Sequence, residues 1–86
     1  MCGDVNGDGE VEIVDAVLVG RYVNNNEGLT WAEFCQKQGI KQDAEQALAN
    51  ADAFKPSDKR ELTSEDQKAI IGYVNGLYPK LPINEL

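Results

Sequence analysis

Oxygen-bearing side chains recur at regular intervals in the stretch Asp4-Val5-Asn6-Gly7-Asp8-Gly9-Glu10-Val11-Glu12-Ile13-Val14-Asp15. Counted from Asp4, they stand at positions 1, 3, 5, 9 and 12, and a glycine stands at position 6. This is the spacing of a loop that wraps around Ca²⁺, in which alternate side chains point inward and glycine makes the sharpest bend. The sequence therefore predicts a calcium-binding loop over residues 4–15.

The expected ligands of this first loop are all oxygen atoms. Four side chains would bind directly, position 7 through its backbone carbonyl, and position 9 through a water molecule. The four direct ligands are the side chains of Asp4, Asn6, Asp8 and Asp15. Glu10 would bind through its backbone carbonyl and Glu12 through the water molecule. Five carboxylates lie in the loop and no Lys or Arg precedes Arg21, so they repel one another unless a cation is bound. The alternative, an acidic turn that binds nothing, explains the glycines but not the oxygen spacing.

The chain has 86 residues and a formal net charge of −7, from 15 acidic and 8 basic residues. A single domain of this size buries a limited core, and bound metal would stabilise it, so we expect folding and calcium binding to be coupled. The negative charge argues against nucleic acid or an anionic membrane as partner, and no apolar stretch approaches the ~20 residues of a membrane span. We find no signal peptide and expect a module of a longer protein, monomeric when free.

Two residue types bear on chemistry. There is no histidine, and we find no phosphate-binding glycine motif and no nucleophile motif, so we do not expect an enzyme. Cys2 and Cys35 could form one disulfide or remain two free thiols. We favour free thiols, with Cys35 as a small buried apolar residue.

The loop and the residues that follow it occur twice. A shift of 51 residues aligns Val11-Glu12-Ile13-Val14-Asp15 with Leu62-Thr63-Ser64-Glu65-Asp66, and Tyr22-Val23-Asn24 with Tyr73-Val74-Asn75. The second loop, residues 52–66, is three residues longer and has no glycine at its bend. A second Ca²⁺ is expected there, with Asp52, Ser57, Asp58, Asp66 and the Glu61 carbonyl as ligands. Because Lys59 and Arg60 disfavour a cation, the alternative is a decayed loop closed by ordinary hydrogen bonds.

Each loop leads into a predicted helix. The first helix, about residues 14–24, ends in the polar run Asn24-Asn25-Asn26. The second, about residues 64–75, has Thr63 or Ser64 as its N-cap and stops near Gly76.

The connector between the repeats is also predicted to be helical. Thr30 and Glu33 form a capping box that starts a helix ending near Gly39. Residues 42–50 are helical in composition, so the connector is one kinked helix or two short ones. Prolines at 79 and 82 predict an extended tail. The expected organisation is one domain, 1–86, with repeat one at 3–25, the connector at 29–50, repeat two at 51–76 and the tail at 77–86.

Only three residues precede Asp4, so we expect no entering helix of the EF-hand kind. The unit is a loop followed by a helix, also called an F-hand. Two such units packed antiparallel, with a helical connector, predict an all-α domain with its ions at opposite ends.

Further motifs in both repeats point to a family. They are Gly3-Asp4-Val5-Asn6-Gly7-Asp8-Gly9 and Gly20-Arg21-Tyr22-Val23 in repeat one, and Asp52, Asp66 and Gly72-Tyr73-Val74 in repeat two. With the duplicated loop–helix unit, they resemble the dockerin modules of cellulosomal proteins, although the insertion and missing glycines of the second loop depart from the pattern. The longer connector, with Trp31 and Phe34, is closer to the divergent dockerins of rumen bacteria.

This resemblance implies a non-catalytic adaptor that docks onto a cohesin module of a scaffoldin, in a secreted polysaccharide-degrading complex outside an anaerobic bacterium. The family's partner contacts lie at the end of each loop and along the following helix. Carried over, they are Ile13, Val14, Val17, Gly20 and Arg21 in repeat one, and Ser64, Glu65, Lys68, Ile71 and Gly72 in repeat two.

The first helix is apolar nearly all round. Its expected core residues are Val11, Leu18, Val19, Tyr22 and Val23. Ile13, Val14 and Val17 are apolar too, so they either form a face for a partner or are covered by the connector. The matching residues of repeat two, Ser64, Glu65 and Lys68, are polar, which predicts a single binding mode through the first helix. Trp31 and Phe34 are expected in the core.

An EF-hand-like calcium sensor or buffer is the alternative function. Sensors expose a Met-rich groove, whereas the only methionine here is Met1. Paired EF-hands also need four helices around their two loops, which the short segment before Asp4 does not provide.

Overall fold

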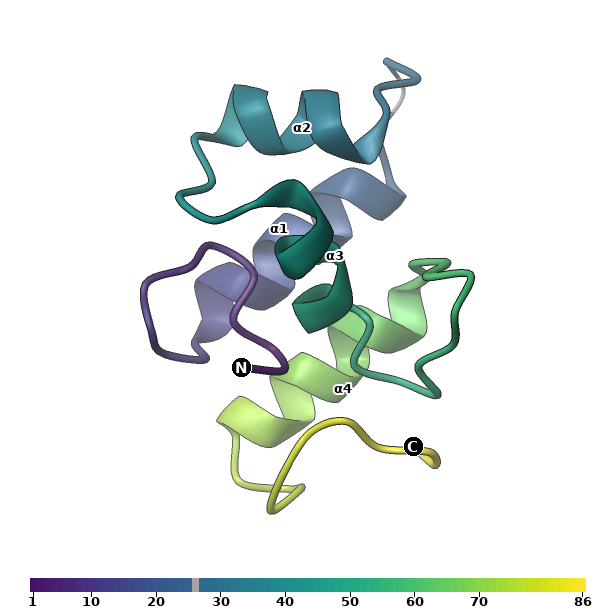
Figure 1. The fold of residues 1–86 in the computed structure, drawn as a ribbon. Helices are drawn as coiled ribbons and strands as arrows, with labels where there is room; N and C mark the ends of the chain where they lie inside the picture. The colour runs from purple at the N-terminus through teal and green to yellow at the C-terminus, as the bar shows by residue number, and fades with distance from the viewer. Residues whose placement is uncertain (26) are drawn as a thin grey trace.

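The computed structural model describes residues 1–25 and 27–86, and this part of the chain contains four helices joined by loops (Figure 1). They are α1 (Ile13–Val23), α2 (Trp31–Gln38), α3 (Ala44–Ala51) and α4 (Ser64–Val74). No strand forms among the described residues, which confirms the all-α prediction. Asn26, the last residue of the predicted asparagine run, lies outside them.

Helices α1 and α4 begin in the same way, each at the end of an acidic loop. The N-cap residues are Glu12 and Thr63. Their backbone N–H groups donate to the Oδ2 atoms of Asp15 and Asp66, at 2.7 and 2.8 Å. A carboxylate at the third helical position offsets the unpaired N–H groups of the first turn. The last acidic residue of each loop thus also fixes the start of its helix, and both helices fall within one residue of their predicted bounds.

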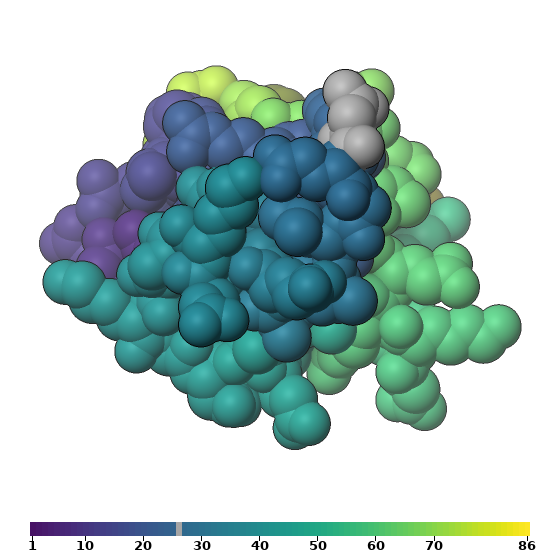
Figure 2. Space-filling model, turned by 90° about the horizontal axis from the view of Figure 1, so that it is seen from above, coloured from purple at the N-terminus to yellow at the C-terminus, as the bar shows by residue number. Residues whose placement is uncertain are grey.

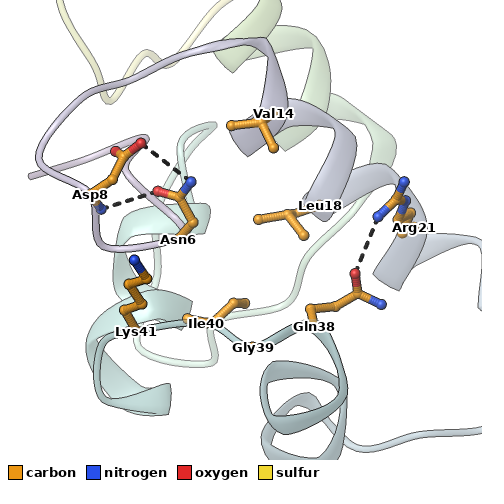
Figure 3. A pocket seen from close by; sticks show the side chains of 9 residues that line it. All are labelled: Asn6, Asp8, Val14, Leu18, Arg21, Gln38, Gly39, Ile40 and Lys41. Carbon is orange, nitrogen blue, oxygen red and sulfur yellow. Dashed lines mark hydrogen bonds between the residues drawn. The ribbon is translucent and has the colours of Figure 1, made fainter.

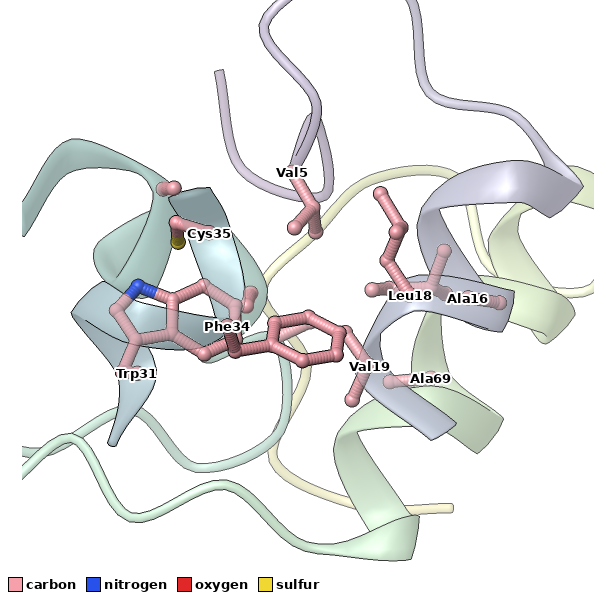
Figure 4. Packing of buried hydrophobic residues seen from close by; sticks show 12 residues of the cluster. Val5, Ala16, Leu18, Val19, Trp31, Phe34, Cys35 and Ala69 are labelled. Carbon is pink, nitrogen blue, oxygen red and sulfur yellow. The ribbon is translucent and has the colours of Figure 1, made fainter. Parts of the chain in front are cut away.

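Small buried side chains allow α1 and α4 to pack closely (Figure 4). The small side chains are Ala16 of α1 and Ala69 of α4, which are almost completely buried, and the larger buried side chains of Val19 and Ile70 lie in the same core. The first loop, residues 4–15, and the second loop, residues 52–66, lie on opposite sides of this pair in Figure 1, as expected for antiparallel units. We call them loop one and loop two.

The connector forms two short helices and carries most of the aromatic core. The Trp31 ring stacks on Phe34 with 5.6 Å between centroids, and Tyr22 of α1 meets their edges at 5.0 and 5.4 Å. The Trp31 Nε1–H group donates to the Ala44 carbonyl at 2.8 Å, so the buried indole is satisfied. Trp31 and Phe34 are therefore core residues, as predicted, and Figure 2 shows the connector, in blue and teal, over this face of the molecule.

Capping residues next to the connector helices determine where these helices begin and end. Thr30 and Glu33 form the predicted capping box of α2, and Gly39 ends that helix with φ of 69°, in the left-handed region. Helix α3 begins later than the expected residue 42, because the Asp43 side chain accepts the Gln46 N–H and acts as its N-cap.

The tail returns to the start of loop two. The Ile83 N–H donates to the Ala53 carbonyl at 3.0 Å, and the Lys55 N–H donates to the Ile83 carbonyl at 2.8 Å. The tail is not extended throughout, contrary to the prediction, because the chain bends at residues 77–81 to turn back; it pairs with the start of loop two through an isolated bridge between Phe54 and Ile83.

Cys2 and Cys35 are free thiols, as favoured above. Burial raises the pKa of the Cys35 thiol to about 11, so it behaves as an inert apolar residue. Within the described residues, no helix has the length and apolar character that crossing a membrane requires.

Gly20 and Gly72 are buried inside helices, and we expect substitution by alanine to have opposite effects on stability at these two positions. A Cβ at Gly20 would meet the flexible end of Gln67, whereas a Cβ at Gly72 would meet the Tyr78 ring. We expect Gly20→Ala to keep or raise stability, because Gln67 can move and alanine gains about 1 kcal/mol in helix propensity. We expect Gly72→Ala to lose about 1–3 kcal/mol through overpacking. Urea unfolding with saturating Ca²⁺ measures both, and equal stabilities would contradict this packing.

Candidate metal loops and docking face

Loop one is folded around its first acidic residue. The two carboxylate oxygens of Asp4, which is buried, accept the N–H groups of Gly7 and Gly9 at 3.1 and 3.0 Å. Both glycines have φ values, 82° and 90°, that side-chain-bearing residues rarely adopt. The glycines at these places are therefore needed to bring backbone N–H groups back to Asp4.

The last acidic residue of loop one is completely buried. Asp15 Oδ1 accepts the N–H groups of Val5 and Asn6 at 2.9 and 3.2 Å, and Oδ2 accepts the Glu12 N–H. Burial raises the pKa of Asp15, the three N–H groups oppose this, and the negative charge of Asp4 adds to it. The two ends of the loop thus place two carboxylates close enough to repel each other.

The middle of loop one contains two successive turns of the same kind. In each, a side-chain oxygen accepts the backbone N–H of the residue two positions later in the chain. Asn6 Oδ1 accepts the Asp8 N–H at 3.1 Å, and Asp8 Oδ1 accepts the Glu10 N–H at 3.0 Å. A hydrogen bond with Glu10, and the negative charges of Asp8 and Glu10, raise the pKa of the exposed Glu12. Acidic groups therefore crowd along the loop.

These observations fit a hard cation in loop one. The loop supplies only oxygen donors, and the two ion pairs found in the described part of the chain, Lys37 with Glu27 and Arg60 with Asp52, lie elsewhere. Among the described residues, no three Asp, Glu, Cys or His side chains already converge as a metal cage. The loop therefore has the donors and the charge for calcium, with its oxygens held on backbone N–H groups.

The connector holds loop one in place by polar contacts that sequence reasoning missed. The Gln42 side-chain amide donates to the carbonyls of Asp4 and Val5 at 2.7 and 2.8 Å. The Asn50 amide donates to the Asp4 carbonyl at 2.9 Å, and the Asn50 carbonyl accepts the Gly3 N–H at 2.7 Å. No local pattern marks these residues, because their partners lie 37 to 47 positions away.

Loop two keeps the first and last acidic residues of the pattern. Asp52 and Asp66 are buried, and Asp66 Oδ1 accepts the Phe54 N–H at 2.9 Å. Asp52 Oδ2 accepts the Ser57 N–H at 3.1 Å and also pairs with the Arg60 guanidinium at 3.3 Å. The other expected ligands, Ser57, Asp58 and Glu61, are exposed. Loop two thus shares its ends with loop one and differs in the middle.

The apolar residues Ile13, Val14 and Val17 form an exposed patch on α1, which we call the α1 patch. Their side chains are 48%, 44% and 37% exposed. The alternative that the connector covers them is therefore wrong. Arg21 is exposed on the same helix and donates to the Gln38 side-chain carbonyl at 3.2 Å (Figure 3).

A pocket of about 360 Å³ adjoins the α1 patch (Figure 3). It lies between loop one, α1 and the middle of the connector, where α2 ends. Its lining residues are Asn6, Asp8, Val14, Leu18, Arg21 and residues 38–41. Residues 38–41 could not be predicted at this site, because their position depends on how the connector folds back.

The carried-over partner positions divide into two groups. Ser64, Glu65 and Lys68 are exposed and polar on α4, while Ile71 is half-buried. Gly20 and Gly72 differ from the expectation, because both are buried, against Gln67 and Tyr78 of this same chain. Close packing on the Tyr78 ring explains the glycine at position 72, and neither Gly20 nor Gly72 lies on an open face.

Two acidic loops, each leading into a helix capped by the last acid of its loop, define a calcium-binding loop–helix module of the F-hand class. The family model for the dockerin type I domain matches residues 2–55, from before loop one into the start of loop two. This is more than half of the chain, which therefore belongs to the type I dockerin family. Dockerins are non-catalytic modules that bind calcium and bind cohesin modules in extracellular cellulosome complexes. No curated protein matches the chain.

Proposed function

We propose that this dockerin attaches its parent protein to a cohesin module of a scaffoldin through the open side of α1, in a single orientation. The main observation that supports this docking site is the α1 patch, where three neighbouring apolar side chains are exposed on one helix. A small domain gains nothing in solution from such exposure, whereas a partner surface would remove the patch from water.

Arg21 and the pocket beside it complete the proposed face. The bond to Gln38 holds the guanidinium at the rim, where a charged group gives orientation more than affinity. The pocket next to Val14 has room for one side chain of the cohesin. The α1 patch would then be the centre of the interface, where truncations cost most.

A single orientation is supported by the difference between the two helices. The residues of α4 that match the α1 patch are Ser64, Glu65 and Lys68, all exposed and polar. A cohesin surface that is apolar enough to cover the α1 patch would leave these polar groups poorly solvated. Rotating the module to present α4 is therefore disfavoured.

Calcium in loop one is proposed to hold this face in shape. The ligands would be the carbonyl of Glu10, a water molecule on Glu12, and the side chains of Asp4, Asn6, Asp8 and Asp15. A bound Ca²⁺ would neutralise the crowded carboxylates of the loop. Because Asp15 also caps α1, the ordering of loop one fixes the first turn of the helix that carries the patch.

The proposed setting is the outside of an anaerobic bacterium, with the free module a monomer. The test is calorimetric titration of the calcium-loaded chain against a panel of cohesin modules. We expect saturable binding of one cohesin per chain for at least one member. A folded, calcium-loaded chain that binds none of a broad panel would contradict the proposal.

A further inference from the structure

We propose that loop two is closed by the guanidinium of Arg60 in place of a metal ion, so that the module binds one Ca²⁺, in loop one. The inference rests on the proposed calcium site of loop one and concerns the residues that replace the second site. The main observation that supports it is the ion pair between Arg60 and Asp52, the first acidic residue of loop two.

The carboxylate of Asp52 is almost completely removed from water. Its side chain is 3% exposed, and its Oδ2 atom accepts from the Ser57 N–H at 3.1 Å and from Arg60 Nη1 at 3.3 Å. A buried carboxylate needs a compensating charge, and a guanidinium supplies a permanent one. Asp52 therefore has its counter-ion within the chain, whereas Asp4 in loop one pairs with no basic side chain among the described residues.

A calcium ion and Arg60 would compete for the same oxygen. Ca²⁺ binds oxygen at about 2.3–2.6 Å, so an ion on Asp52 Oδ2 would lie next to the guanidinium and be repelled by it. The wider loop favours the arginine as well. Residues 4–15 hold five acidic and no basic residues, net −5, while residues 52–66 hold five acidic and three basic residues, net −2.

The backbone conformation of loop two also favours the contact between Arg60 and Asp52. Arg60 has φ of 51° and Lys55 has φ of 46°, in the left-handed region that loop one reaches only with glycine. Of these two residues, Arg60 is the one whose side chain reaches back eight positions to Asp52. Meanwhile the expected middle ligands Ser57, Asp58 and Glu61 remain exposed.

The first test counts the ions. Native mass spectrometry of the full chain at saturating Ca²⁺ is expected to show one bound ion, and still one in Asp52→Asn. Two ions in the unaltered chain, one of them lost in Asp52→Asn, would overturn the inference. A chain that binds no ion would contradict the proposed site in loop one, and the comparison below would then decide the role of Arg60.

The second test compares two neighbouring basic residues. Arg60→Gln removes the partner of buried Asp52, while Lys59→Gln removes the same charge from an exposed residue of the same loop. At constant Ca²⁺ we expect Arg60→Gln to lower the Tm by roughly 4–8 °C and Lys59→Gln to leave it nearly unchanged. Equal melting temperatures for the two variants would overturn the proposal, whichever ion count is found.

Discussion

A Val17→Asp variant is expected to lose cohesin binding, with Kd rising at least about 100-fold, while its calcium-dependent folding is retained. Val17 belongs to the exposed α1 patch, so a carboxylate there costs little in the free chain. In the complex the same carboxylate would be buried against an apolar surface without a partner. Calorimetry measures the affinity, and circular dichroism with and without Ca²⁺ verifies the fold.

Lys68→Asp provides the matched control, because residue 68 follows residue 17 by the repeat length of 51 and is exposed on α4. We expect this variant to bind cohesin with less than about a threefold change, as for a surface residue outside the interface. Near-normal binding by Val17→Asp would contradict the proposed site. Equal losses in both variants would contradict the single orientation.

Removal of calcium is expected to unfold much of the module. Without the ion, the five carboxylates of loop one repel one another, and Asp15 caps the helix on which the core depends. An ion present at 1,000 times its Kd stabilises the folded state by about 4 kcal/mol, which is close to the whole stability of a small domain. A chelator should therefore reduce the helical circular dichroism signal and abolish cohesin binding, and Ca²⁺ should restore both.

Paired variants assign this effect to one loop. Asp8 and Asp58 are exposed acidic residues in the middle of loop one and loop two. Asp8→Asn should weaken calcium binding and lower the Tm at limiting Ca²⁺, whereas Asp58→Asn should do neither. A metal-free chain with unchanged helix content and cohesin affinity would show that calcium is not needed for the docking face.

The helices could be predicted from the sequence because their signals are local. Thr30 with Glu33, and Thr63 before Ser64, are caps that act within one helical turn, and α2 and α4 begin where these signals place them. Helix α1, for which no cap was predicted, begins at Ile13, one residue before its expected start. Helix α3 was expected to begin two residues early, at residue 42. Its cap is Asp43, and Gln42 instead extends to the backbone of loop one.

The candidate site could be predicted only in part, because its completion depends on residues far apart in the chain. The spacing of loop one identified Asp4 and Asp15, whose carboxylates accept backbone N–H groups of the loop in the structure. It could not reveal that Asn50 and Gln42 brace the loop, or that Arg60 pairs with Asp52. Exposure of the α1 patch likewise depends on where the connector packs, and the sequence left both possibilities open.

Hydrogen exchange of the amides in the cohesin complex tests the central claim most directly. Docking through the open side of α1 predicts that exchange slows around Ile13, Val14 and Val17 on cohesin binding, while the exposed side of α4 around Glu65 and Lys68 keeps its free rate. Slowing confined to α4, or equal slowing on both helices, would contradict docking through α1 in one orientation.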